Sequence, residues 1–178
     1  MREVWENMKN WLIAVMAMLL LTACGDEQEA SPEQLQKTIE DGTVGFEVKG
    51  DSIQEATNIP KDEKQQIINA FNEYIAAFNE KDLDRYQNII SKNAEGFDYV
   101  EDVKAVTEVF KQYDVNRTAK DITIVKYSKE NAQVFSNLTT HTKELETGVE
   151  LSGTGRQVTV FVKEDSWKVS SIYYIGNE

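Results

Sequence analysis

The sequence predicts an α+β fold in which helices come first and an antiparallel sheet follows. Apolar residues recur with a helical period of about 3.6 in the first half, and from Thr118 the period changes to about 2, which is typical of strands. The later segments are joined by turns of a few residues, short enough for hairpins. With 178 residues, 40% of them hydrophobic, and only 2 Pro and 9 Gly, the composition is that of one compact domain.

The charge balance argues against nucleic-acid binding. The chain has 19 Lys and Arg against 31 Asp and Glu, a formal net charge of -12, so a phosphate backbone is repelled. One Cys and one His leave no zinc constellation and no disulfide framework. The sequence therefore predicts neither a metal site nor a cofactor.

The first two dozen residues are expected to be an export signal. An uncharged apolar run over 11–21 follows Lys9, and it is too short to span a bilayer, which needs about 20 residues. The sequence Leu21-Thr22-Ala23-Cys24 at its end resembles the lipobox of bacterial lipoproteins, in which the Cys thiol receives a diacylglyceryl group and the chain is cut just before it. The alternative is that Cys24 is an ordinary small residue near a signal-peptidase site, or a buried thiol.

Lipidation at Cys24 implies a location for the protein. It places the chain at the extracytoplasmic face of a bacterial cell membrane, as a palmitate-bearing lipoprotein, and the general character of the sequence favours a Gram-positive cell. Two acyl chains make membrane residence stable where one is marginal. Translation starts at Met1 or at Met8, and the second choice gives a more basic leader.

Four segments are expected along the chain. They are a signal peptide, an acidic tether, a weakly structured lead-in with a short strand near 44–48, and the folded domain, and each differs in composition from its neighbours. Their ranges are 1–23, 24–37, 38–60 and 61–178.

Three helices are predicted in the first part of the domain. The first runs over 62–79, where Asp62 and Gln65 form a capping box. A second, shorter helix follows a cap at Asp82 and ends near Ser91, and a third begins with the capping box Asp98-x-x-Glu101. The apolar stripes of the three are Ile67, Ile68, Phe71, Tyr74, Ile75 and Phe78; Leu83, Tyr86, Ile89 and Ile90; Val103, Val106, Phe110 and Tyr113.

Four strands are predicted to follow, near 120–128, 131–143, 150–163 and 166–175. Because hairpin turns join them, the sheet should be an antiparallel meander. Gly153 and Gly155 lie inside the third strand and indicate a bulge or a bend.

Two stretches of the chain resemble the NTF2-like superfamily, also called the SnoaL or ketosteroid isomerase-like cone fold. They are the run from Phe71 to Tyr86 (FNEYIAAFNEKDLDRY) and the closing Ser166 to Ile172 (SWKVSSI), and the resemblance covers roughly residues 62–175. It implies a cone of three helices packed on a curved antiparallel sheet of four or more strands. It implies little about activity, because the superfamily includes isomerases, cyclases, dehydratases and non-catalytic binding domains.

Alignment with ketosteroid isomerase suggests one catalytic hypothesis. Tyr74 falls at the oxyanion-hole tyrosine and Asp98 at the general-base aspartate, but the second oxyanion donor maps near Val158, which has no donor to offer. The alternative assigns Tyr74 to the core and Asp98 to a helix N-cap. In the cone that the resemblance implies, the expected pocket-lining residues are Tyr74, Phe78, Phe110 and Phe161.

His141 and a pair of aspartates are the remaining site candidates. His141 lies on the polar side of its predicted strand, where it either lines a ligand cavity, acts as an acid or base, or belongs to a wet sheet surface. Asp82 and Asp84 could be offered as cation ligands, but acidic residues at a helix start are explained by the helix dipole.

Three functions remain open from the sequence. The first is a non-catalytic binding domain on a membrane-anchored lipoprotein, which takes a small apolar ligand or an envelope protein and can form a homodimer through its sheet. The second is an isomerase or dehydratase that uses Tyr74 and Asp98. The third is a structural accessory of an envelope complex, with the cone filled by its own side chains.

Overall fold

The helices and sheet follow the predicted order. The computed structural model describes residues 48–49 and 52–175, which belong to one compact unit. Cys24, the predicted signal peptide, the acidic tether and most of the lead-in lie outside the described residues. Within the described part of the chain, no helix combines the length and the apolar character needed to cross a membrane.

The first described element is a small hairpin. β1 (Val48–Lys49) pairs antiparallel with β2 (Ser52–Ile53). The strand predicted near 44–48 overlaps it only at Val48.

Three helices then form one layer of the domain. They are α3 (Lys61–Asn79), α4 (Leu83–Ile89) and α5 (Tyr99–Gln112). Two of the three predicted caps are confirmed: Asp82 accepts a hydrogen bond from the Arg85 amide, and Asp98 Oδ1 accepts from the amides of Val100 and Glu101.

The predicted capping box of the first helix is wrong. The helix starts at Lys61, so Asp62 already lies in its first turn, and the N-cap is Pro60, which makes no side-chain cap hydrogen bond. The Pro60 carbonyl instead accepts the first helical bond, from the Lys64 amide. Asp62 is left with the favourable field of the helix N-terminus and no capping role.

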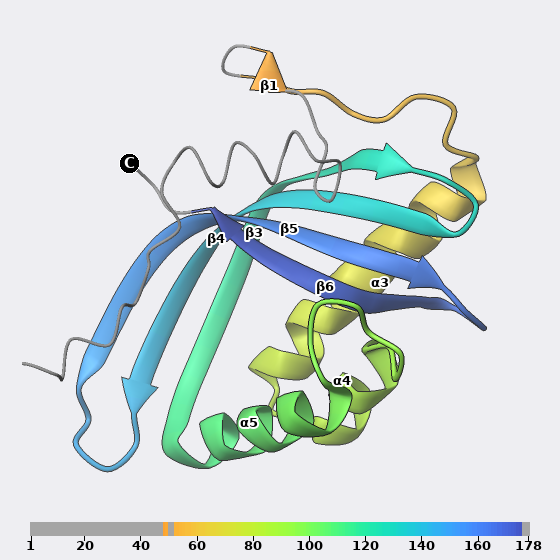
Figure 1. Cartoon of the computed structure of the whole chain (residues 1–178). Coiled ribbons are helices and arrows are strands. Elements are labelled where there is room, and N and C mark those ends of the chain that lie inside the picture. Colours follow the sequence, from red (N-terminus) through yellow and green to blue (C-terminus); the bar gives the residue numbers. More distant parts are fainter. Residues whose placement is uncertain (1–47, 50–51, 176–178) are drawn as a thin grey trace, which may run out of the picture. The chain divides into compact units, whose positions relative to one another are not determined.

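A four-stranded antiparallel meander forms the second layer. Its strands are β3 (Tyr113–Tyr127), β4 (Asn131–Glu144), β5 (Glu150–Lys163) and β6 (Trp167–Ile175), in the order β3-β4-β5-β6. Figure 1 shows α3 lying across one face of this sheet, with α4 and α5 beside it. The predicted α+β architecture of three helices on a four-stranded antiparallel sheet is confirmed.

Two local expectations about the strands are wrong. β3 starts at Tyr113, directly after α5, and its first seven residues pair with the end of β4, so the strand begins well before 120. Of the bulge or bend expected at Gly153 and Gly155, the bulge is wrong, since β4 and β5 pair without a register shift from Asn131–Val162 to Lys143–Glu150. The register shifts lie instead between β3 and β4, one around Asp121, whose φ is 54°, and one between Ile124 and Lys126. A third lies between β5 and β6, at Val160 and Phe161.

The core lies between the two layers. Its helix side comes from the predicted apolar stripes, and its sheet side comes from alternate residues of all four strands. Side chains that are at most 2% exposed include Ile67, Phe71, Tyr74, Tyr86, Ile124, Val134, Phe161, Trp167 and Val169.

Candidate functional site

Tyr74 lies inside the domain and is bonded to an arginine that the sequence did not single out. Its side chain is 1% exposed, and its hydroxyl accepts a hydrogen bond of 3.1 Å from Nη1 of Arg117 on β3. Burial raises the pKa of Tyr74 to about 12, and the nearby guanidinium only partly offsets this. Tyr74 is therefore a neutral phenol over the physiological pH range.

Arg117 is held from two sides. Its guanidinium carbon lies 3.5 Å from the centre of the Phe78 ring, which is close cation–π contact. Its backbone is fixed by Asn79, whose side-chain amide bonds both the carbonyl and the amide of Arg117 at 2.8 Å. The arginine head is thus placed at one position over the end of α3.

A second tyrosine–carboxylate pair lies next to this one. Tyr86 of α4 donates a hydrogen bond of 2.9 Å to Oδ2 of Asp102 on α5, and its ring centre lies 6.1 Å from that of Tyr74. Burial raises the pKa of Asp102 and of Tyr86, while the charge of Arg117 acts in the opposite direction on both. We call Tyr74, Tyr86, Asp102 and Arg117 the Arg117 cluster.

Three of the four predicted pocket-lining residues lie together at this cluster. Phe78 contacts Phe110 edge to face at 5.2 Å and Tyr86 at 6.0 Å, beside Tyr74. Phe161 lies on β5 opposite Ala132 and Val169 and is fully buried. Aromatic side chains therefore fill much of the space between α3, α4 and α5.

Asp98 lies at a different place. It is exposed at the start of α5, where one oxygen of its carboxylate accepts two backbone amides. Tyr74 has its hydroxyl on Arg117, not on Asp98. The carboxylate that approaches the two buried tyrosines is Asp102, one turn further along the same helix.

Two buried polar side chains on the sheet also escaped the sequence analysis. Ser136 and Gln157 are 0% exposed and directly opposite each other on β4 and β5, near the Val158 position considered above. Ser136 Oγ and Gln157 Oε1 make no hydrogen bond in the part of the chain that the structure describes.

His141 lines a surface depression at one end of the sheet, and Asn79, Thr142 and Leu151 line it too. Its Nδ1 is 2.7 Å from Ser152 Oγ, and a cavity of about 400 Å³ opens beside them at the ends of β3, β4 and β5. The register places His141, Ser152 and Asn116 on the sheet face opposite to the helices. The full lining is Asn79, Asp114, Val115, Asn116, His141, Thr142, Lys143, Glu150, Leu151 and Ser152.

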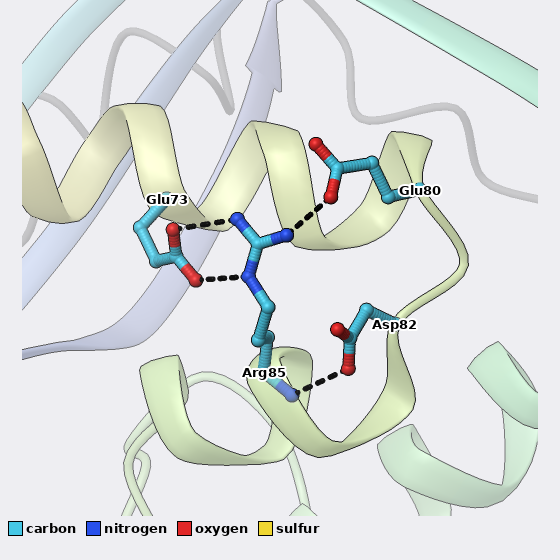
Figure 2. A network of polar contacts seen from close by, with 4 residues as sticks. All are labelled: Glu73, Glu80, Asp82 and Arg85. Atoms are coloured by element: carbon cyan, nitrogen blue, oxygen red, sulfur yellow. Dashed lines mark hydrogen bonds and ion pairs between the residues drawn. The ribbon is translucent and has the colours of Figure 1, made fainter.

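Asp82, at the start of α4, belongs to a network of polar contacts around Arg85. Figure 2 shows the Arg85 side chain between Glu73 of α3 and Glu80, which follows α3. The backbone amide of Arg85 donates a hydrogen bond to Asp82. Arg85 donates to both Glu73 oxygens, at 2.6 and 2.8 Å, and this bond lowers the pKa of Glu73. Within the described ranges, no three His, Cys, Asp or Glu side chains are grouped as a metal site.

Comparison with solved structures defines the class of fold. A proposed aromatic ring hydroxylase from Novosphingobium aromaticivorans is 13% identical with a TM-score of 0.62, and the match covers 68% of this chain and 93% of that one. An NTF2-like superfamily protein from Salmonella enterica is 18% identical with a TM-score of 0.56, covering 65% and 91%. A hexachlorocyclohexane dehydrochlorinase (LinA Type2) is 11% identical with a TM-score of 0.56, covering 66% and 86%. The domain thus has the NTF2-like fold.

A family model then identifies the domain more closely. Residues 69–174, more than half of the chain, match the model of the C-terminal domain of anti-sigma-I factor RsgI9. The chain belongs to this domain family. No curated protein sequence matches it significantly.

Proposed function

We propose that this protein is an extracytoplasmic lipoprotein, anchored through Cys24, whose NTF2-like domain binds a ligand or a partner protein without catalysing a reaction. The lipobox-like sequence before Cys24 and the short apolar run ahead of it support the anchor. The matching family model is that of the C-terminal domain of an anti-sigma-I factor, and this name supports a binding role.

One observation carries the non-catalytic part of the proposal. The two residues of the isomerase hypothesis are used for other purposes: the Tyr74 hydroxyl accepts from Arg117 inside the domain, and Asp98 caps α5 at the surface. A general base must come within hydrogen-bond reach of the proton that it removes, and an oxyanion donor must point at the substrate. The positions of Asp98 and Tyr74 favour neither the role of a general base nor that of an oxyanion donor.

The anchor can be tested by labelling and fractionation. The full chain is expressed with an alkyne analogue of palmitate, in the native form, as Cys24→Ser, and as the control Thr22→Ser, which keeps the cysteine. Native protein and control should carry label and sediment with membranes, and Cys24→Ser should do neither. A Cys24→Ser protein that is processed and still sediments with membranes would contradict the anchor.

The binding role can be tested on the full chain extracted from membranes with detergent. Mass spectrometry of the purified protein should find a stoichiometric small molecule or protein, which is then titrated back onto stripped protein and should bind saturably. A turnover of that molecule that disappears in Tyr74→Phe would overturn the non-catalytic assignment.

A structural accessory of an envelope complex is the second candidate. It is favoured by the aromatic filling of the space near Tyr74, where Phe78 and Phe110 are in edge-to-face contact. In that case the co-purified material contains an envelope protein and no small molecule.

A further inference from the structure

The guanidinium of Arg117 has donors to spare. An arginine carries five N–H groups, and the hydrogen bond to Tyr74 uses one of them. The ion pairs among the described residues include none with Arg117, although the charge of Arg117 acts on Asp102. In the described part of the chain, Arg156 Nε is a buried nitrogen without a hydrogen-bond partner, and no nitrogen of Arg117 is of this kind. The unbonded N–H groups of Arg117 are therefore accessible to solvent.

The sheet beside Arg117 is open. The register aligns Arg117, Thr140 and Gly153 in one row across β3, β4 and β5, on the face that carries Arg117 towards the helices. A Cβ atom built on Gly153 would meet no heavy atom within 4 Å, so the row ends in free space. The next row brings Thr142 and Leu151, and Leu151 is 69% exposed. We call these five residues the Arg117 shelf.

The shelf joins a fixed cation to an apolar surface. At one end is a planar guanidinium that is held by Phe78 and Tyr74 and can bond both oxygens of a carboxylate. At the other end is the exposed side chain of Leu151. Figure 1 shows the end of β4 beside the start of β5 at one end of the sheet.

The surrounding charge selects among anions. The chain carries a net charge of -12, and Asp102 is close to the cation. A dianion such as a phosphate monoester would therefore meet more repulsion than a single carboxylate. Thr140, directly opposite Arg117, and Thr142, in the next row, add hydroxyl groups on the same face of the sheet.

We propose that the Arg117 shelf binds a small organic carboxylate with an apolar group. The carboxylate is held by the free N–H groups of Arg117, and the apolar group lies over Gly153 towards Leu151. This inference rests on the proposed function, since it names the ligand class of the binding domain.

The test uses the detergent-solubilised full chain and two probes of equal shape, 4-phenylbutyrate and its neutral amide. Calorimetry should show saturable binding of the acid and at least tenfold weaker binding of the amide. Addition of the acid should also shift the Arg117 Nε–Hε resonance in a nitrogen–proton correlation spectrum. No binding of the acid, equal binding of the amide, or an unmoved Arg117 resonance would each overturn the proposal.

Three variants separate the shelf from a general effect of charge. Arg117→Gln should weaken binding of 4-phenylbutyrate at least tenfold, and Gly153→Val should do the same by filling the open space over β5. Arg156→Gln is the matched control, because it removes an arginine from the opposite face of the same sheet, and it should bind as the native protein does. Native-like binding by Arg117→Gln, or loss only in Arg156→Gln, would contradict the assignment.

Folding is checked by thermal unfolding of each variant. If Arg117→Gln does not fold, Arg117→Lys and Gly153→Val provide the same test, since lysine keeps the charge and loses the planar fork. Failure here can be told apart from failure of the proposed function. A protein that ignores 4-phenylbutyrate but retains a co-purified neutral ligand or protein partner refutes the carboxylate and keeps the binding role.

Discussion

The side-chain amide of Asn79 satisfies both backbone polar groups of Arg117. Nδ2 donates to the Arg117 carbonyl and Oδ1 accepts from the Arg117 amide, each at 2.8 Å. β3 is an edge strand of the sheet, so these groups would otherwise face outward and invite another strand. The end of α3 thereby covers the edge of β3 and fixes the position of the Arg117 backbone relative to Tyr74.

Removal of this amide should destabilise the domain. Asn79→Ala loses two partly buried hydrogen bonds, and we expect the free energy of unfolding to fall by about 1–3 kcal/mol. Urea unfolding followed by circular dichroism measures this change. Asn72→Ala, an exposed position on the same helix, is the control and should stay within about 0.5 kcal/mol of the native protein. Equal losses in both variants would contradict the role of Asn79.

The buried phenol of Tyr74 predicts a loss of stability in alkali. Its pKa is raised to about 12 in the folded state, against about 10 in an unfolded chain, so the folded state keeps its proton longer. This contribution is fully present below about pH 10 and is lost as the pH rises to about 12, at up to about 1.4 kcal/mol per pH unit. Tyr86 acts in the same direction, because its pKa is also raised.

Urea unfolding at several alkaline pH values tests this prediction. Tyr74→Phe cannot ionise, so its free energy of unfolding should fall less steeply with pH than that of the native protein. The residual slope then reports Tyr86 and the other titrating groups. Parallel curves for the two proteins would show that Tyr74 is not the group that titrates.

The helices were predictable because their signals are local. The stripe Ile67, Phe71, Tyr74, Phe78 repeats every three to four residues, and it forms the buried face of α3. The start of β3 was missed because its inward positions, Val115, Arg117 and Ala119, include a charged residue and a small one. This segment therefore lacks the alternation of apolar and polar residues that predicts a strand.

The Arg117 cluster depends on contacts that no local pattern encodes. Tyr74 and Arg117 are 43 positions apart, and they meet only when α3 lies on β3. The one available signal was an arginine that alternates with apolar residues in a strand. From the sequence, Tyr86 is one residue of an apolar stripe and Asp102 is one polar residue of a helix. Their burial and their hydrogen bond to each other arise only when α4 packs against α5.

Asp98 and Asp62 offer a matched test of capping. Asp98 accepts two backbone amides at the start of α5, so Asp98→Ala should cost about 1 kcal/mol of unfolding free energy. Asp62 lies in the first turn of α3 without a capping bond, and Asp62→Ala should cost no more than a few tenths, about 0.3 kcal/mol. Chemical denaturation of both variants gives the comparison. If Asp62→Ala were the more damaging, the assigned start of α3 would be wrong.

Gly96 and Gly153 differ in the space that a side chain would meet. A Cβ atom on Gly96 would lie 2.5 Å from Ser171 Oγ and 2.9 Å from Ser171 Cα, and the Gly96 amide bonds the Ser170 carbonyl at 3.0 Å, so the loop cannot move away freely. We expect Gly96→Ala to lower the free energy of unfolding by about 1–3 kcal/mol through overpacking. Gly153→Ala adds the same methyl group where nothing lies within 4 Å and should be neutral, or stabilising by about 0.5 kcal/mol, because glycine weakens a strand interior. Thermal and urea unfolding of the two variants measure the difference, and a Gly96→Ala protein as stable as Gly153→Ala would mean that the loop before α5 does not press against β6.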